Sequence, residues 1–181
     1  EPRRERAIDA VVSTHAENCT TVDEDQLTEF VVALFGAGGW QEKGAYVSLR
    51  GFYEPGQRKP EKGDIVSVKV NGDLTRSMDA IAAGAIQLAT YMATREEPYN
   101  FSPPVALFNN PKGWQARNED LCYAPALSVD VDDDYEAAKA ILKPLLGEPT
   151  VGVHSGGLNA DGKPKGHLHY RLGKPATTSE E

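Results

Sequence analysis

The segment Leu127-Ser-Val-Asp-Val-Asp132 constrains the fold most strongly, because apolar and polar residues alternate along it. Successive side chains of a strand point to opposite faces, so the three apolar residues are expected on one face and Ser128, Asp130 and Asp132 on the other. We expect the apolar face to pack on a helix. The pattern therefore predicts a strand with one open face that carries two carboxylates.

Asp130 and Asp132 lie two residues apart on this strand, a spacing at which two carboxylates can converge on one hard cation or bridge a pair. Two uncompensated acids there would repel each other, and a bound divalent cation would remove that cost. We therefore predict a metal site at Asp130 and Asp132. Asp133 and Asp134 are instead predicted to lie in the turn that caps the next helix.

The residues after this strand predict a helix and two more strands. The helix covers 135–146 and ends at Gly147, and its core face is expected to contain Ala138, Ile141, Leu142 and Leu145. A strand is expected at 150–154, a polar, hairpin-like excursion at 156–166 and a strand at 167–172. This order predicts an α+β fold, with a mainly antiparallel sheet and helices on one face.

Upstream patterns predict an N-terminal α/β lobe over residues 23–120. Asp23 and Gln26 form a capping box before a helix that ends at Gly36. Strands are expected at 45–52, 64–70 and 104–108, a helix at 78–94 capped by Ser77, and a polar loop at 109–120. Residues 1–22 are expected to form a tail or helix, residues 121–173 the α+β module, and residues 174–181 a tail.

The bulk composition excludes some classes of protein. The 181 residues carry a net charge of −8, which argues against nonspecific coating of nucleic acid. No apolar run is long enough for a membrane span, and the N-terminal stretch is too charged for a secretory signal. We expect a cytoplasmic protein without a membrane partner. Cys19 and Cys122 share no metal-ligand spacing and are expected to be reduced and structural.

A second polar group follows the helix, where residues 154–174 hold four Lys or Arg against one Asp, and three of the four histidines. Glycines after a strand let backbone amides approach a phosphate, and Ser155 and Lys165 add a hydroxyl and a positive charge. Val153-His-Ser-Gly-Gly157 with the lysines is therefore a candidate triphosphate cradle. The alternative is an ordinary hairpin. His154 alternates away from Ser155, which lowers its functional interest.

Three motifs occur together in this order: Val129-Asp-Val-Asp132, Ser155-Gly-Gly157 and Lys165-Gly-His-Leu-His-Tyr-Arg-Leu172. Together they resemble motifs I and II of the archaeo-eukaryotic primase superfamily, especially plasmid- and phage-type primase-polymerases. The upstream segments Phe30–Gly36 and Gly44–Arg50 also resemble the N-terminal lobe of such replication proteins. The resemblance extends from about residue 26 to residue 172.

This resemblance implies an RRM-like catalytic module that performs template-directed nucleotidyl transfer. Asp130 and Asp132 would hold two Mg²⁺ or Mn²⁺ ions, and with His167 they form the implied catalytic set. The implied nucleotide contacts are Ser155, Gly156, Gly157, Lys163, Lys165, His167, His169 and Arg171. The implied partners are a single-stranded nucleic-acid template, an NTP or dNTP, and a C-terminal helicase or other replication domain.

The sequence departs from the family pattern in two places. The excursion between Leu158 and Pro164 is an insertion relative to a tighter turn, and Lys163 is an alternative to Lys165 as the phosphate ligand. The third acid of the family lies on a strand after motif II, and no candidate strand follows Leu172. We therefore expect an incomplete two-carboxylate site with weak metal and nucleotide binding and little catalysis in this chain.

Two other functions fit parts of the sequence. His167-Leu-His169 is a His-hydrophobic-His pattern of the kind that binds metal in rolling-circle nickases and relaxases, which use a tyrosine as the nucleophile. A non-catalytic nucleic-acid-binding domain that retains the sheet is the third reading. An acid on a later strand would favour the polymerase, and a tyrosine on a later helix would favour the nickase.

Overall fold

The computed structural model describes residues 8–11, 22–41, 44–53, 64–94, 99–102, 105–109 and 116–177. The protein belongs to the α+β class, and its strand pairs are mainly antiparallel. It divides into two compact units. Unit 1 combines the N-terminal strand with Ala126–Leu172, and unit 2 contains the described residues of Glu17–Pro125 and of Gly173–Glu181. Cys19, Glu180 and Glu181 lie outside the described residues.

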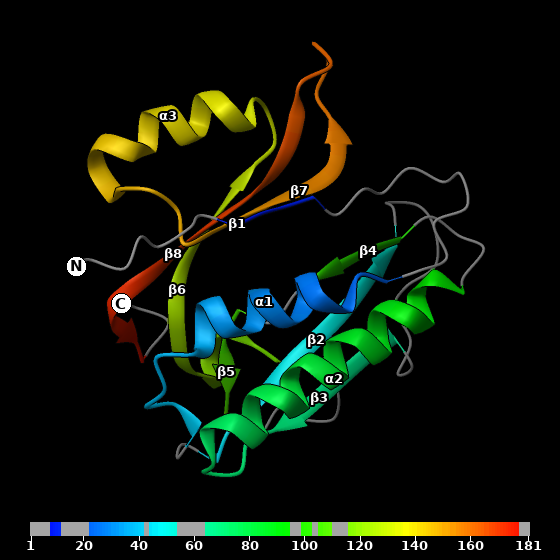
Figure 1. Cartoon of the computed structure of the whole chain (residues 1–181), viewed down its shortest axis with the longest axis vertical. Helices are drawn as coiled ribbons and strands as arrows, with labels where there is room; N and C mark the ends of the chain where they lie inside the picture. The colour runs from blue at the N-terminus through cyan, green and yellow to red at the C-terminus, as the bar shows by residue number, and fades with distance from the viewer. Residues whose placement is uncertain are drawn as a thin grey trace. The chain divides into compact units, whose positions relative to one another are not determined.

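In the described residues, unit 1 contains four strands and one helix, which are labelled in Figure 1. They are β1 (Ile8–Val11), the second half of β6 (Leu121–Val131), α3 (Tyr135–Leu146), β7 (Val151–Leu158) and β8 (Pro164–Ala176) as far as Leu172. The strand order is β1-β7-β8-β6. β7 and β8 pair antiparallel, and β1 adds a parallel strand against β7. The stretch 1–22, expected as a tail or helix, therefore contributes a strand.

The hairpin-like excursion expected at 156–166 is a β-hairpin, as predicted, although its strands are longer than expected. β7 continues to Leu158 and β8 already begins at Pro164, so only a short turn separates them. The Asn159 amide donates to the Lys163 carbonyl at 2.9 Å, and Gly162 adopts a φ of +77°, which favours glycine. The register shifts between His154 and Leu158, because the pairing contains a bulge there.

α3 covers one face of the unit 1 strands. Asp134 caps the helix by accepting a hydrogen bond from the Ala137 amide at 3.1 Å, as the sequence predicted. Four buried residues form the core under the helix: Val131, Tyr135, Leu168 and Tyr170. Val129, Ala138 and Leu142 pack against them. Of the three apolar residues predicted to face the helix, Val129 and Val131 do so, whereas Leu127 is exposed.

The predicted core face of α3 was wrong for two residues. Ile141 is 71% exposed and Leu145 is 77% exposed. The buried side of the helix follows Tyr135, Ala138 and Leu142, which are three and four residues apart. Ile141 lies about 100° around the helix from Leu142, and Leu145 is in the last turn. Periodicity alone placed the face too far around the helix.

This exposure leads to a prediction for stability. Ile141→Ser and Leu145→Ser are expected to change the free energy of unfolding by less than about 0.5 kcal/mol, because both side chains already contact water. Leu168→Ala, at a fully buried position, is expected to lower it by about 2 to 5 kcal/mol. Urea denaturation of the three variants measures the contrast. A loss at Ile141 or Leu145 as large as that at Leu168 would contradict the described orientation of α3.

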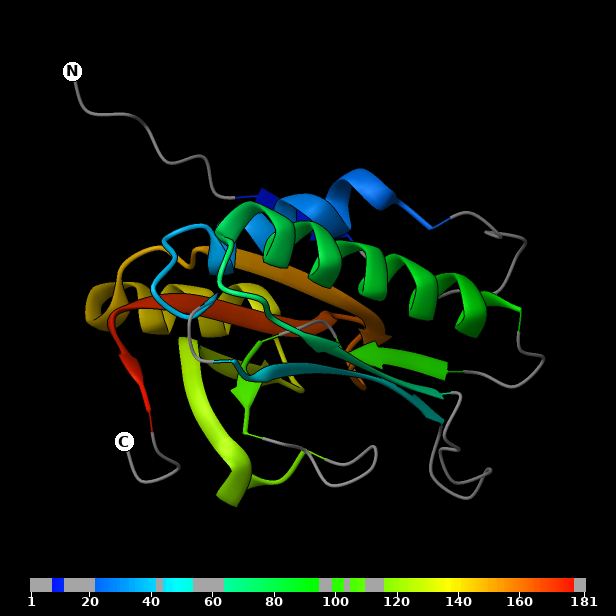
Figure 2. The same ribbon diagram turned by 90° about the horizontal axis from the view of Figure 1, so that it is seen from below.

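Unit 2 contains two helices packed beside antiparallel strands (Figure 2). Its elements are α1 (Glu24–Phe35), β2 (Tyr46–Tyr53), β3 (Ile65–Lys69), α2 (Leu74–Ala93), β4 (Tyr99–Ser102), β5 (Leu107–Phe108) and the 3₁₀ turn η3 (Asn118–Asp120). The strand order is β6-β5-β2-β3, and β4 also pairs with β2. α2 packs closely on β2, because a Cβ added to Gly84 of the helix would lie only 3.3 Å from Leu49 Cδ1 of the strand.

The two helix starts of unit 2 test the predicted caps. Asp23 caps α1 by accepting from the Gln26 amide at 3.0 Å, as predicted. Ser77 does not cap α2, which begins a turn earlier because Asp73 accepts from the Arg76 amide at 2.9 Å. Ser77 is buried within the helix and accepts from the Asn71 amide at 3.2 Å. No helix in the described part of the chain combines the length and apolarity of a membrane span.

Candidate functional site

β6 and β8 are neighbouring strands, and their polar side chains meet in pairs on the face away from α3. Ser128 Oγ lies 2.8 Å from His169 Nδ1. Asp130 Oδ1 lies 3.5 Å from His167 Nδ1, and Asp132 Oδ1 lies 3.5 Å from Lys165 Nζ. Each step of two residues forward on β6 matches a step of two back on β8, as in an antiparallel pair. We call these three contacts the cross-strand ladder.

The cross-strand ladder changes the electrostatic argument for the two acids. From the sequence, Asp130 and Asp132 were expected to need a metal ion to offset their repulsion. In the structure, each carboxylate has a partner on β8 that is cationic (Lys165) or becomes cationic on protonation (His167). The acids are also 69% and 84% exposed, so water screens them. Repulsion between the acids therefore does not by itself require a metal.

His169 differs from His167 in its surroundings. It is only 3% exposed, whereas the side chain of His167 is 41% exposed, and their rings stack with centroids 6.3 Å apart. Burial, with a smaller effect of the neighbouring His167, lowers the pKa of His169 from 6.5 to about 4. His169 is therefore neutral at pH 7. Its hydrogen bond with Ser128 holds the buried end of the cross-strand ladder.

The lowered pKa of His169 leads to a pH prediction. Unfolded His169 binds a proton between pH 7 and pH 5, and folded His169 does not, so the free energy of unfolding is expected to drop by about 2 kcal/mol over this interval. This contribution is complete above the unfolded pKa and is lost as the pH falls toward the folded pKa. Denaturation at both pH values measures it. An NMR titration in which the His169 imidazole protonates near pH 6.5 would contradict it.

Ser155 and Lys165 flank Gly157. A Cβ added to Gly157 would lie 3.6 Å from Ser155 Oγ and 3.5 Å from Lys165 Cδ, so both side chains border the surface that this glycine leaves open. The neighbouring Gly156 adopts a φ of +78°, a conformation that glycine adopts without strain. The structure thus brings the hydroxyl and the ammonium of the predicted phosphate cradle to the end of the ladder at Asp132.

Three other residues considered from the sequence lie outside the cross-strand ladder. Arg171 is exposed two residues beyond His169 on β8, and its amide donates to Thr150 Oγ1 at 3.0 Å. Lys163 contacts Asp134 at the start of α3 instead of joining the cross-strand ladder. That contact lowers the pKa of the Asp134 carboxyl and raises the pKa of Lys163. His154 lies on the face of the sheet that α3 covers, and its ring centroid is 4.3 Å from the ring centroid of Tyr135.

The donors on this face are chemically suited to Mg²⁺ or Mn²⁺ in one respect. Such ions are bound by one or two carboxylates together with waters and substrate phosphates, and Asp130 and Asp132 supply two exposed carboxylates. Within the described ranges, no group of three or more His, Cys, Asp or Glu residues is arranged to hold a metal. Asp130 and Asp132 could therefore supply at most two of the ligands that such an ion needs.

The sequence placed Ser128 on the open face with Asp130 and Asp132, but it did not predict the contact of Ser128 with His169. Asn159 was missed altogether. Asn159 gave no signal, because its side-chain amide donates to Asp133 at 2.7 Å only after the hairpin folds back.

A search of family models, curated proteins and solved structures finds no match to this chain.

Proposed function

We propose that this chain is part of a primase-polymerase of the archaeo-eukaryotic primase superfamily, with an RRM-like catalytic module in unit 1. One observation carries the proposal: Asp130 and Asp132 lie on an open face opposite His167 and Lys165, and Ser155 and Lys165 both lie beside Gly157. The two segments that resemble motifs I and II are separated by a helix in the sequence and adjacent in the fold. Acids, cations and a hydroxyl side by side suit a metal-bound polyphosphate.

In this proposal, Asp130 and Asp132 bind Mg²⁺ or Mn²⁺, which supplies charge stabilisation for the attacking and leaving oxygens. Lys165 and Ser155 bind the phosphates of the incoming NTP or dNTP, and His167 donates a hydrogen bond to them. Ser128 and His169 position the paired strands. The single-stranded template, and a helicase or other replication domain as partner, belong to the same proposal.

The cross-strand ladder favours this function over a nickase. A His-hydrophobic-His metal site needs both imidazoles to present a nitrogen to the same ion. Here His169 is 3% exposed and its Nδ1 is engaged by Ser128, while the imidazole of His167 is directed to Asp130. The two histidines therefore have different partners and different exposure.

The test is primer synthesis and extension by the full-length protein on single-stranded DNA, with NTPs or dNTPs and Mg²⁺ or Mn²⁺. We expect products whose sequence follows the template. Nicking of a supercoiled plasmid without synthesis would support the nickase instead. Binding of single-stranded DNA with neither activity would support a non-catalytic domain.

A further inference from the structure

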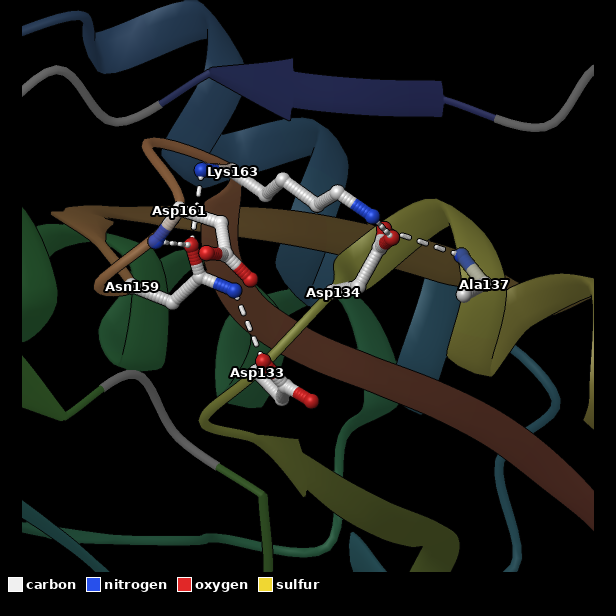
Figure 3. A network of polar contacts seen from close by, with 6 residues as sticks. All are labelled: Asp133, Asp134, Ala137, Asn159, Asp161 and Lys163. Carbon is white, nitrogen blue, oxygen red and sulfur yellow. Dashed lines mark hydrogen bonds and ion pairs between the residues drawn. The ribbon is translucent and has the colours of Figure 1, made fainter.

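Three consecutive acids in the turn between β6 and α3 each contact one side chain of the β7–β8 hairpin. Asp132 faces Lys165, Asp133 accepts from the side-chain amide of Asn159 at 2.7 Å, and Asp134 is paired with Lys163. Figure 3 shows the last two contacts side by side. The three contacts differ in position, since only the contact of Asp132 lies on the open face of the sheet.

The tip of the hairpin is ordered by its own hydrogen bonds. Asn159 Oδ1 accepts hydrogen bonds from the backbone amides of Asp161 at 2.9 Å and Lys163 at 2.8 Å. The Nδ2 atom of Asn159 donates a hydrogen bond to Asp133 (Figure 3). Lys163 binds the carboxylate that also caps α3 through the Ala137 amide. The tip is therefore attached to the start of the helix. This attachment holds the hairpin strand on which Lys165 lies, and the lysine ammonium is carried on a flexible four-carbon stem.

Lys165 forms an ion pair with Asp132, one of the two carboxylates that the proposed metal ion would need. Its Nζ lies 3.5 Å from Asp132 Oδ1, and its side chain is 33% exposed. Two cations close to one carboxylate repel each other, so an ammonium on Asp132 opposes a divalent ion there. The lysine stem passes Gly157, whose other near neighbour is Ser155 Oγ, and the proposed phosphate surface begins there. One ammonium is thus within reach of the acid site and the proposed anion site.

Building on the proposed function, we propose that Lys165 is a built-in counter-ion of Asp132. Without a divalent cation, Lys165 neutralises Asp132. When the cation arrives with a polyphosphate, Lys165 leaves Asp132 and pairs with the phosphate oxygens beside Ser155. Lys165 therefore weakens binding of the cation alone and strengthens binding of the cation–polyphosphate complex, which favours entry of the metal together with the nucleotide.

The experiment compares Mn²⁺ and the Mn²⁺–tripolyphosphate complex as probes, by calorimetry at low ionic strength. Lys165→Met is expected to bind Mn²⁺ about two- to five-fold more tightly than wild type, the range of an exposed ion pair. The same variant is expected to bind Mn²⁺–tripolyphosphate about five-fold or more weakly, because a charge-assisted contact is lost. Lys165→Arg is expected to restore both affinities toward wild type. At 0.5 M salt the gain for Mn²⁺ should shrink, since screening weakens the Lys165–Asp132 pair.

Two further variants separate the possible failures. Lys143→Met removes an ammonium that pairs with Glu148 on another part of unit 1, and neither affinity should change. Asp132→Asn should lose Mn²⁺ binding. Asp132-dependent Mn²⁺ binding that Lys165→Met leaves unchanged or weakens would overturn the counter-ion role alone. Absence of Asp132-dependent Mn²⁺ binding in both wild type and Lys165→Met would overturn the counter-ion role together with the proposed metal site.

Discussion

Gly166→Ala is expected to destabilise unit 1 by at least about 3 kcal/mol. A Cβ at this position would lie 2.2 Å from the Val153 carbonyl oxygen and 2.9 Å from Tyr135 Cδ2. The carbonyl belongs to β7, which is paired with β8 at this point. The tyrosine is the first residue of α3, and its side chain is fully buried between the helix and the strands. Neither neighbour can move without separating the strands or lifting the helix. Denaturation followed by circular dichroism measures the loss.

Gly157→Ala is the matched control on the same hairpin. Its added Cβ would meet Lys165 Cδ at 3.5 Å and Ser155 Oγ at 3.6 Å, which are ordinary contact distances. We expect it to change the free energy of unfolding by less than about 1 kcal/mol. Equal stability of the two alanine variants would contradict the described packing of α3 on the β7–β8 hairpin.

The second large effect concerns the two acids of the open face. In the full-length protein, Asp130→Asn combined with Asp132→Asn is expected to reduce primer synthesis at least about a hundred-fold, because the metal's charge stabilisation is worth several kcal/mol. The fold should be preserved, since both side chains are mostly exposed. The yield of labelled product on single-stranded template measures the activity.

Glu136→Gln serves as the control for this double variant. Glu136 is an exposed acid in the first turn of α3, and its replacement removes a negative charge without touching the cross-strand ladder. We expect near wild-type synthesis. Synthesis that survives in the double asparagine variant would remove Asp130 and Asp132 from the catalytic set, and equal losses in both variants would point to a general effect of charge.

Local patterns predicted the elements whose signals are short-range. The alternation before Asp132 located the end of β6, and the run after Asp134 gave the bounds and the cap of α3. The two caps show the limit of such reasoning. Asp23 was found because Gln26 follows it at the expected spacing, whereas Ser77 was predicted as a cap and Asp73, also a good capping residue, is the observed one. The choice depends on where tertiary contacts let the helix begin.

Contacts between distant segments were beyond the sequence. β1 pairs with β7, about 140 residues away, and a four-residue strand carries no information about its partner. The alternation put His167 and His169 on one face, but it did not show that His169 is buried against Ser128 while His167 faces Asp130. The attachment of Lys163 to Asp134 likewise depends on how the hairpin folds back.

The proposed function requires that the open face of unit 1 binds a divalent cation at Asp130 and Asp132. The most direct measurement is paramagnetic line broadening of backbone NMR signals of this chain by a small amount of Mn²⁺. We expect selective broadening at residues 128–132 on β6 and 165–169 on β8, and its disappearance when both acids are replaced by asparagine. Broadening that is centred elsewhere, or that persists in the double variant, would contradict the account.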